Sequence, residues 1–194
     1  MRPMSRPKNE EKLHAIHRAA LKLLVRSGFS SVKMADIAKE AGVASGTLYI
    51  YYSSKEHLLN ALFVLTKQEI AQHMFRMFDP KEDYLSSFRN MWFAYMQYCI
   101  DFPEKMLFVE QFLYSGLITA ENIEQTELFF EPLNTFLDTG RKKKYLLNID
   151  AALLKASMAG SIHEFVKWMH SQHIKPNNSL LENLFRLQWK GISQ

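Results

Sequence analysis

The sequence predicts an all-α protein. Its 194 residues include only seven glycines and six prolines, the residue types that most often interrupt helices. Apolar residues make up 47% of the chain and aromatic residues 13%, which is typical of a globular protein rather than a disordered one. Apolar side chains recur at helical spacing in successive segments, and no segment has a credible strand pattern, so we expect about nine helices.

A first helix is expected from Asn9 to Ser27. Asn9 is a suitable N-cap, acidic residues follow it at the positive end of the helix dipole, and Gly28 marks the end. Its apolar stripe consists of Leu13, Ile16, Ala20, Leu23 and Leu24. One broad face of this helix is therefore expected to be buried.

The stretch from Val32 to Leu59 predicts a helix-turn-helix followed by the start of a third helix. In its first helix, apolar residues recur at i, i+3, i+4 and i+7, which places them on one face; they are Met34, Ile37, Ala38 and Ala41. Gly42 lies in the turn, where a residue with positive φ is commonly needed. The second helix is expected from about Ala44 to Tyr51.

The second helix has no charge, begins with small residues and ends with aromatic ones. Small residues allow a backbone to approach another surface, and Thr47 also carries a methyl group that can contact a thymine methyl. Phenolic hydroxyls and a lysine in the first turn of the next helix are suitable partners for phosphate oxygens. The candidate DNA contacts are Lys33, Ser45, Gly46, Thr47, Tyr49, Tyr51 and Lys55.

Two observations bear on this interpretation, one against it and one in its favour. The same segment is also compatible with an ordinary turn into a core helix, with the tyrosines serving only to pack. The charge distribution favours the DNA interpretation, because residues 1–60 hold ten basic and five acidic residues, a net +5, while the rest of the chain carries −1. A basic face is expected of a nucleic-acid-binding surface. The excess is modest, and without the motif a solvated charged surface would explain it nearly as well.

The segment resembles the signature of the TetR family of bacterial transcriptional regulators. The resemblance is carried by Ile37-Ala38, Ala41-Gly42-Val43, Gly46-Thr47-Leu48-Tyr49, Tyr51-Tyr52 and Ser54-Lys55-Glu56-His57-Leu58, in order and without gaps. It covers roughly the first 60 residues, and beyond them only length and helical pattern are similar. The resemblance implies a three-helix DNA-binding head, a helical domain for ligand binding and dimerisation, and a double-stranded DNA operator as partner.

Two positions depart from the family pattern. Val32 stands where the family often has Thr, and it can neither cap a helix nor donate to a phosphate, so Ser31 or Lys33 is expected to replace that function. Ala44 stands where a Ser or Thr is common, and Ser45 is the candidate to replace its capping oxygen. The basic segment Met1 to Lys8 is expected to be a disordered arm whose Arg2, Arg6 and Lys8 either contact DNA or are only solvated.

The remaining chain is expected to be helical. A connecting helix runs from Ser54 to about Phe78, and the segment 119–140 is expected as one helix with a kink at Pro132. Arg141 to Lys144 is expected as a basic loop. The other helices are expected at 82–102, 103–115, 150–173 and 178–191. We therefore divide the chain into a DNA-binding domain at residues 1–53 and a ligand-binding and dimerisation domain at residues 54–194.

The family resemblance implies a ligand cavity in the second domain, whereas aromatic stripes taken alone are more often core. The candidate lining residues are Trp92, Tyr95, Met96, Phe108, Phe112, Phe129 and Met158. Such a lining implies an apolar, aromatic-compatible effector, because apolar pockets carry only a few polar groups. Glu110, Gln111 and His163 are candidates for these groups, with a surface position as the alternative for Glu110.

The last two helices are expected to form a dimer interface, which the resemblance implies is a four-helix bundle. Small residues on the first of them permit close approach, and the apolar surface is larger than a terminal hairpin needs. The candidate interface residues are Phe165, Trp168, Leu181, Leu184, Phe185 and Trp189. The alternative is that these side chains form intramolecular core.

Several classes of function have little support in the sequence. No catalytic motif is present, His163, His170 and His173 are a weak metal candidate because histidines at a helix end usually interact with the dipole, and we expect neither metal nor cofactor. The single cysteine, Cys99, excludes an internal disulfide and is expected to be buried. With no apolar run long enough to span a membrane, a cytoplasmic protein is expected.

The motif and its resemblance to the TetR family thus predict a DNA-binding transcriptional regulator. The resemblance further implies a homodimeric repressor that an apolar small molecule releases from its operator. The alternative is a helical small-molecule-binding or partner-docking protein without sequence-specific DNA binding.

Overall fold

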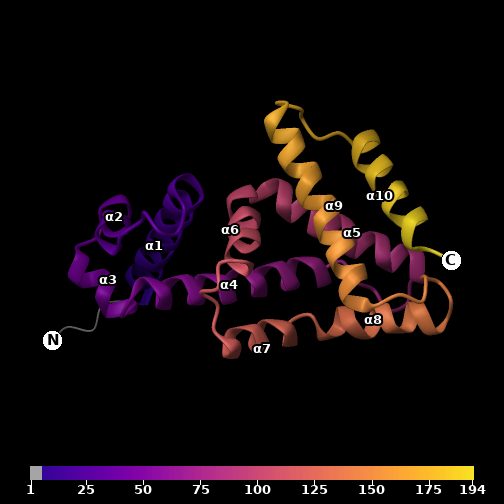
Figure 1. Cartoon of the computed structure of the whole chain (residues 1–194), viewed down its shortest axis with the longest axis horizontal. Helices are drawn as coiled ribbons and strands as arrows, with labels where there is room; N and C mark the ends of the chain where they lie inside the picture. Colours follow the sequence, from indigo (N-terminus) through magenta and orange to yellow (C-terminus); the bar gives the residue numbers. More distant parts are fainter. Residues whose placement is uncertain (1–5) are drawn as a thin grey trace. The chain divides into compact units, whose positions relative to one another are not determined.

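The computed structural model describes residues 6–194, and side chains from Asn9 onward. In this range the chain forms ten helices (Figure 1): α1 (Arg6–Ser27), α2 (Met34–Glu40), α3 (Ser45–Tyr51), α4 (Lys55–Phe75), α5 (Tyr84–Asp101), α6 (Pro103–Leu113), α7 (Ala120–Leu128), α8 (Glu131–Lys142), α9 (Ala151–Ser171) and α10 (Asn178–Ile192). The β-structure in this range is one isolated bridge between Leu146 and Ser193. The predicted all-α class is confirmed.

The chain divides into two compact units. The head unit contains residues 1–66 and 104–123, and the body unit contains residues 67–103 and 124–194. The boundary therefore falls inside α4, and most of α6 groups with the DNA-binding helices. The functional division that we expect between residues 53 and 54 stays a prediction.

The head core is built from the faces that the apolar spacing indicates. Ile16 and Leu24 of α1, Ile37 of α2 and Leu48 of α3 are each 0% exposed. Burying side chains of this size stabilises a fold by about 1.5–3 kcal/mol each. This shared core therefore holds the three helices together, and α2 and α3, with seven residues each, depend on it because helices this short are not stable alone.

An aromatic cluster joins α6 to the rest of the head unit. The stacked rings of Phe108 and Phe112 lie 5.4 Å apart between centroids. Phe29, in the loop after α1, meets both rings edge-on at 6.1 Å and 5.6 Å, and Phe63 of α4 lies 5.6 Å from Phe112. Edge and offset arrangements of this kind are favourable for aromatic rings.

Asn60 of α4 anchors the segment between α6 and α7. Its amide nitrogen donates to the carbonyl oxygens of Glu56 at 2.9 Å and Leu117 at 3.0 Å. Its amide oxygen accepts from the Thr119 backbone at 3.1 Å and from the Asn122 side chain at 2.9 Å. Since Asn60 is only 7% exposed, these bonds satisfy a buried amide that would otherwise be costly.

In the body unit, α5 packs against α9, and α9 also contacts α8 and α10. Side-chain oxygens cap three helices: Asp83 accepts from the Ser86 amide, Asp150 from Ala152 and Leu153, and Asn177 from Leu180. Gly140 of α8 is required by its neighbour, because a Cβ there would lie 2.0 Å from the hydroxyl oxygen of Tyr84. Only glycine permits this close approach.

Three sequence predictions about element boundaries are wrong. Helix α1 begins at Arg6 rather than Asn9, so Asn9 is not the N-cap. The segment 119–140 forms two helices instead of one kinked helix, and Pro132 lies in the first turn of α8, where its missing N–H has no cost. Arg141 and Lys142 belong to α8 rather than to a loop. The predicted arm contact of Arg2 lies outside the described residues, as do the side chains of Arg6 and Lys8.

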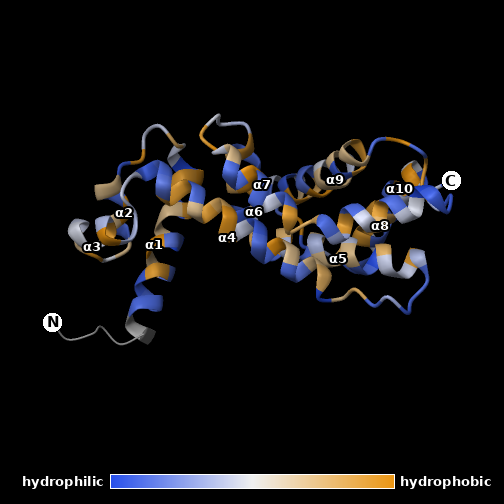
Figure 2. Cartoon of the chain, turned by 90° about the horizontal axis from the view of Figure 1, so that it is seen from below, coloured by the Kyte–Doolittle hydropathy of each residue, from blue (hydrophilic) through white to orange (hydrophobic). Residues whose placement is uncertain are grey.

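The hydropathy pattern explains how these helices pack. In Figure 2 the long helices carry both apolar and hydrophilic residues rather than a continuous apolar surface. Across residues 6–194, no helix has the length and apolar character needed to cross a membrane.

Candidate nucleic-acid interface

The turn between α2 and α3 has the geometry that the sequence predicts. Gly42 has φ +68°, a left-handed conformation that glycine adopts at little cost. The amide of Val43 then donates back to the carbonyl oxygen of Ala38 at 3.0 Å. This turn fixes the direction in which α3 leaves α2.

Helix α3 presents a mostly exposed face and one buried anchor. Leu48 is fully buried, whereas Ser45 and Gly46 in the first turn are exposed and Thr47 is half-buried. Tyr49 is 53% exposed and Ile50 is 80% exposed. Helix α3 therefore offers small groups, hydroxyls and two large side chains to a partner.

Ile50 is an exposed residue of α3 that the sequence analysis does not include among the DNA contacts. Its exposure is high for an isoleucine on a seven-residue helix. The available signal was its spacing, because Ile50 lies four residues after Gly46, on the side of α3 away from Leu48. An apolar side chain here is suited to the methyl groups and sugars of a DNA groove.

Two of the three tyrosines hold α3 against α1. The hydroxyl of Tyr51 donates to the Oδ1 atom of Asn9, and the hydroxyl of Tyr52 lies 2.6 Å from Nε2 of His17. Burial raises the pKa of Tyr52, so the phenol stays neutral. Tyr51 was predicted as a phosphate contact, and in the structure its hydroxyl proton is used within the chain.

Lys55 has a structural task that the sequence did not reveal. Its ammonium donates to the carbonyl oxygen of Phe29 at 2.8 Å and to that of Val32 at 3.2 Å. These carbonyls belong to the loop between α1 and α2. Because an ammonium has three protons, one N–H remains available to a phosphate, but Lys55 is first of all an anchor for this loop.

Lys33 is the exposed lysine at the N-terminus of α2. Its backbone amide donates to Oδ2 of Asp36 at 3.0 Å, which satisfies one of the unpaired amides of the helix start. Ser31 instead donates to the carbonyl oxygens of Ser27 and Gly28. Ser31 and Lys33 are the two candidates to replace the phosphate contact that a threonine at position 32 would make. Since the Ser31 hydroxyl is bonded to the backbone, the exposed Lys33 is the better candidate.

At the start of α3, Ala44 is the N-cap and makes no side-chain cap bond. Its carbonyl oxygen accepts from Thr47 at 2.9 Å and from Leu48 at 3.3 Å. Ser45 is the first residue of α3 rather than its N-cap. The prediction that Ser45 supplies the capping oxygen is therefore wrong.

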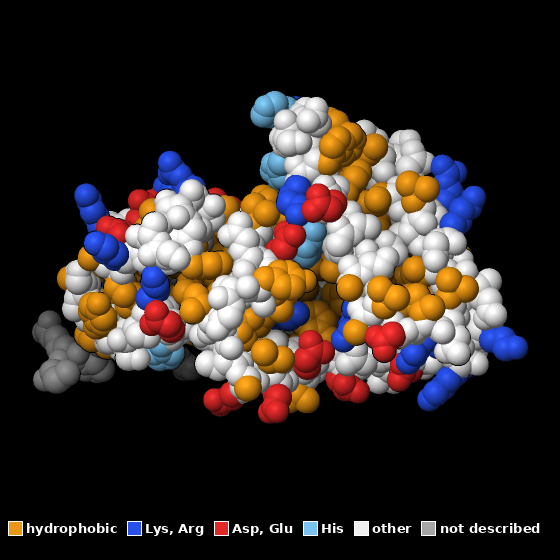
Figure 3. Space-filling model, in the orientation of Figure 1, with side chains coloured by type: hydrophobic (Ala, Val, Ile, Leu, Met, Phe, Trp, Pro, Cys, Tyr) orange, Lys and Arg blue, Asp and Glu red, His pale blue; other side chains and the backbone are white. Residues whose placement is uncertain are grey.

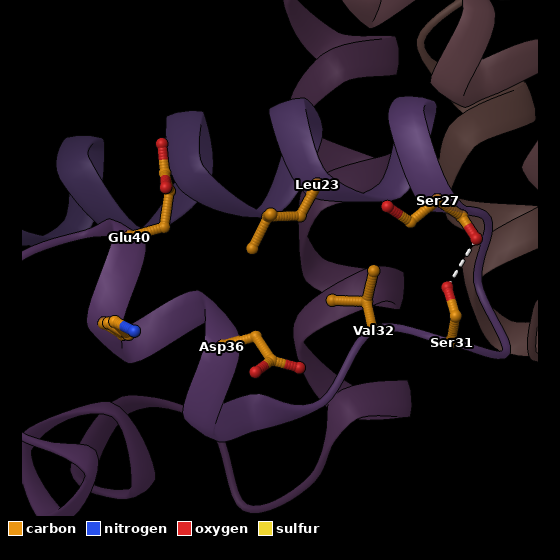
Figure 4. A pocket seen from close by; sticks show the side chains of 7 residues that line it. Leu23, Ser27, Ser31, Val32, Asp36 and Glu40 are labelled. Atoms are coloured by element: carbon orange, nitrogen blue, oxygen red, sulfur yellow. Dashed lines mark hydrogen bonds between the residues drawn. The ribbon is translucent and has the colours of Figure 1, made fainter.

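The surface between α1 and α2 is hollowed beside this interface (Figure 4). The hollow has a volume of about 520 Å³ and is lined by Leu23, Ser27, Ser31, Val32, Asp36, Lys39 and Glu40. Nearby, Lys22 pairs with Glu40 at 2.5 Å. The hydrogen bond and charge of Lys22 lower the pKa of Glu40, so part of the basic charge of α1 is neutralised within the head.

The seven predicted ligand-binding residues fall into both units. Phe108 and Phe112 lie in the aromatic cluster of the head unit. In the body unit, Trp92 and Met96 of α5 are 1% and 0% exposed, and Met158 of α9 is 9% exposed. The Tyr95 hydroxyl lies 2.6 Å from Nε2 of His163, and Phe129 is half-buried. Their role in ligand binding stays a prediction.

The predicted dimer residues differ in exposure. Phe185 is 7% exposed, and its ring lies 5.3 Å from that of Trp92, so here the structure favours the core alternative. Trp168 is 44% exposed, while Phe165, Leu181, Leu184 and Trp189 are intermediate. Two further leucines of these helices, Leu153 and Leu187, are 57% and 71% exposed.

Within the described residues, no group of three or more His, Cys, Asp or Glu side chains has the arrangement of a metal site. The His163 ring lies against Tyr95, His170 lies in the last turn of α9, and His173 lies in the turn after that helix.

Two family models match this chain. The model of bacterial regulatory proteins of the tetR family matches residues 16–62, which include α2, α3 and the turn described above. The model of a tetracyclin repressor-like C-terminal domain matches residues 84–193, more than half of the chain. The chain belongs to the TetR family. It is a transcriptional regulator with a helix-turn-helix DNA-binding domain, and regulators of this TetR family bind DNA and dimerise.

Similar proteins agree with this assignment. A TetR family regulator of Marinobacter aquaeolei VT8 has a structure with a TM-score of 0.90 and 25% identity, and the match covers 97% of this chain and 99% of that one. An uncharacterized HTH-type regulator of Haemophilus influenzae is 32% identical over 85 residues, which are 40% of this chain and 41% of the relative. The Bacillus subtilis regulator YvdT is 29% identical over 133 residues, 66% of this chain and 63% of the relative. The matches thus span less than two thirds of these curated relatives.

Proposed function

We propose that this TetR family member is a repressor whose dimer binds an operator and leaves it when an apolar or aromatic small molecule binds in the helical body. The observation that carries the DNA part is the exposed face of α3, which Leu48 and the Tyr51–Asn9 bond hold in place. A short recognition helix buries little surface alone, so two copies acting on two half-sites are needed for tight binding. In helix-turn-helix dimers the half-sites lie about 34 Å apart.

The proposed contacts divide into base contacts and phosphate contacts. Ser45, Gly46 and Thr47 approach base edges, because they are small and lie in the first turn of α3. Tyr49 and Lys33 contact phosphates, since their polar groups are exposed at the flanks. Ile50 adds an apolar contact. Tyr51 and Lys55 act mainly by positioning α3 and the loop before α2.

The effector part rests on the aromatic and apolar composition of α5 and α9. Trp92 has an indole Nε1 atom that is buried and lacks a hydrogen-bond partner in the described part of the chain. A buried donor of this kind is costly unless another molecule satisfies it. A ligand can shift the protein away from its DNA-binding state only by binding the other state more tightly.

The sign of regulation is tested by transcription in vitro from the promoter upstream of the gene for this chain. Repression predicts that added protein lowers the transcript yield and that an active compound restores it. If the protein instead raises the yield, the chain is an activator and the repressor proposal is wrong. The same reaction with Thr47→Ala protein is the control for an effect that needs the α3 surface.

A further inference from the structure

The body unit contains a partly buried cation without a matched anion. Lys67 lies in the second half of α4, and its ammonium is 4.4 Å from the ring centroid of Phe130, at the junction of α7 and α8. Within the described part of the chain this ammonium makes no hydrogen bond, and its charged neighbours are Glu127 and Lys155. A face-on aromatic ring stabilises a cation, but it does not neutralise the charge.

The neighbouring charges leave an excess of one positive charge. Glu127 of α7 pairs with Lys155 of α9 at 3.4 Å, so two ammonium groups share one carboxylate. Burial lowers the pKa of Lys67, while Glu127 raises it and Lys155 lowers it further. Keeping a partly buried ammonium with too little negative charge is unfavourable for folding. Its presence is therefore better explained by a ligand than by stability.

Buried apolar residues lie near Lys67 and Lys155 along the same two helices. Ile70, one turn further along α4, is 5% exposed, and Leu154 and Met158 on α9 are 0% and 9% exposed. Figure 3 shows a hollow in this face of the body unit, where Figure 1 draws the junction of α7 and α8 beside the lower part of α9. Basic and apolar atoms both border that hollow in the space-filling view. A molecule seated there would meet a cationic group and apolar side chains together.

We propose that Lys67, with Lys155 beside it, binds the negatively charged group of an amphipathic organic anion, and that the effector is therefore an apolar molecule carrying a carboxylate. One excess positive charge matches a monoanion. The ammonium groups donate to the carboxylate oxygens, and the apolar part packs among the side chains of α4 and α9. This inference rests on the proposed ligand-responsive function and specifies the chemistry of the effector.

The test is isothermal titration of the full-length protein with four probes of equal chain length: decanoate, decyl phosphate, 1-decanol and decylammonium. Decanoate should bind about 10- to 100-fold more tightly than 1-decanol, the range expected of one charge-assisted hydrogen bond. Decylammonium should bind more weakly than 1-decanol, because it brings a like charge to Lys67. Tighter binding of decyl phosphate than of decanoate would overturn the choice of a carboxylate.

Variants of Lys67 distinguish the contribution of its charge to ligand binding from the contribution of apolar packing. Lys67→Met keeps an apolar side chain of similar length and should abolish the preference for decanoate over 1-decanol, while Lys67→Arg should retain it. Lys142→Met, on the exposed surface of α8, is the matched control and should behave as wild type. Glu127→Gln removes the competing carboxylate and should tighten decanoate binding, so the inference remains testable if Lys67→Met does not fold.

Failure of this inference differs from failure of the proposed function. Equal binding of decanoate and 1-decanol, absence of binding by all four probes, or an unchanged preference in Lys67→Met would overturn the anion site. DNA binding measured in parallel would be unaffected by those outcomes. If decanoate binds through Lys67 and yet leaves the protein on its DNA, the anion site stands and the ligand-released repressor is wrong.

Discussion

The ammonium of Lys55 donates a hydrogen bond of 2.8 Å to the carbonyl oxygen of Phe29. A second bond from the same group reaches Val32 at 3.2 Å. One lysine at the start of α4 thus orders the loop that leads into α2. The sequence alone predicts that Lys55 contacts a phosphate. Anchoring of the loop affects stability, whereas a phosphate contact affects DNA binding, so experiments can separate the two roles.

Lys55→Met should lower the free energy of unfolding by about 1–3 kcal/mol, because it removes bonds from a charged donor to two partly buried carbonyls. Urea unfolding followed by circular dichroism measures this difference. Lys33→Met is the matched control, since the Lys33 side chain is exposed, and it should unfold as wild type. If the urea midpoint of Lys55→Met equals that of the wild type, Lys55 does not stabilise the loop, and DNA contact is its remaining role.

Lys33→Ala should reduce the salt dependence of DNA binding. Each phosphate neutralised on B-DNA contributes about 0.9 to the slope of log K against log salt. The loss should be the same for specific and scrambled duplexes, because phosphate contacts carry no sequence information. Lys142→Ala, on α8, should leave the slope unchanged; a slope equal to wild type for Lys33→Ala would remove this contact from the interface.

Thr47→Ala should weaken sequence preference, since it deletes both the methyl and the hydroxyl group of a residue in the exposed first turn of α3. The expected loss on the specific duplex is about 1–3 kcal/mol, with little change on a scrambled one. Two further variants identify the group responsible. If a thymine methyl is read, Thr47→Val keeps the preference and Thr47→Ser loses it; the reverse result would assign the contact to the hydroxyl group.

Asn60→Ala should release the segment between α6 and α7. Asn60 accepts from the Thr119 amide and donates to the Leu117 carbonyl oxygen, so the variant leaves both groups without these partners. We expect hydrogen exchange at the Thr119 amide to accelerate markedly, together with a loss of about 1–3 kcal/mol in stability. Asn122→Ala removes only one of the bonds and should have a smaller effect. Unchanged exchange in Asn60→Ala would mean that other contacts hold the segment.

Cys99 should be unreactive in the folded protein. It is 0% exposed, and burial raises the pKa of its thiol to about 12 although a hydrogen bond with Tyr95 opposes the shift. Since the thiolate is the reactive form, almost none is present at pH 8. Labelling with a chromogenic disulfide at that pH should be slow in native buffer and rapid in urea. Rapid stoichiometric labelling without urea would contradict the burial of Cys99.

The sequence predicted the head well because its signals are local. The spacing of Met34, Ile37 and Ala38 and the position of Gly42 specify a short helix and its turn without long-range information. The same reasoning failed between residues 119 and 140, where Pro132 is compatible both with a kink and with a first turn. In the structure α7 ends at Leu128, Phe129 and Phe130 form a turn, and Pro132 lies in the first turn of α8.

The candidate site could be predicted only in part. Residue type identifies Lys33 and Thr47 as contacts, but the partners of Lys55 and Tyr51 lie 26 and 42 residues away in sequence. Periodicity cannot show such pairs. The exposure of Ile50 and the burial of Phe185 likewise depend on tertiary neighbours, so apolar spacing assigns a face without stating whether that face meets the same chain or a partner.

The measurement that tests the central claim most directly is fluorescence anisotropy of the full-length protein on DNA from upstream of its own gene. It is titrated across salt against a scrambled duplex, and repeated with the compounds used for ligand binding. Our account predicts a preference of about 10³ or more for the specific duplex, lost when an active compound is added. Equal, weak and salt-driven binding to both duplexes, with a compound still bound, would contradict it and favour a helical small-molecule-binding protein that does not read DNA sequence.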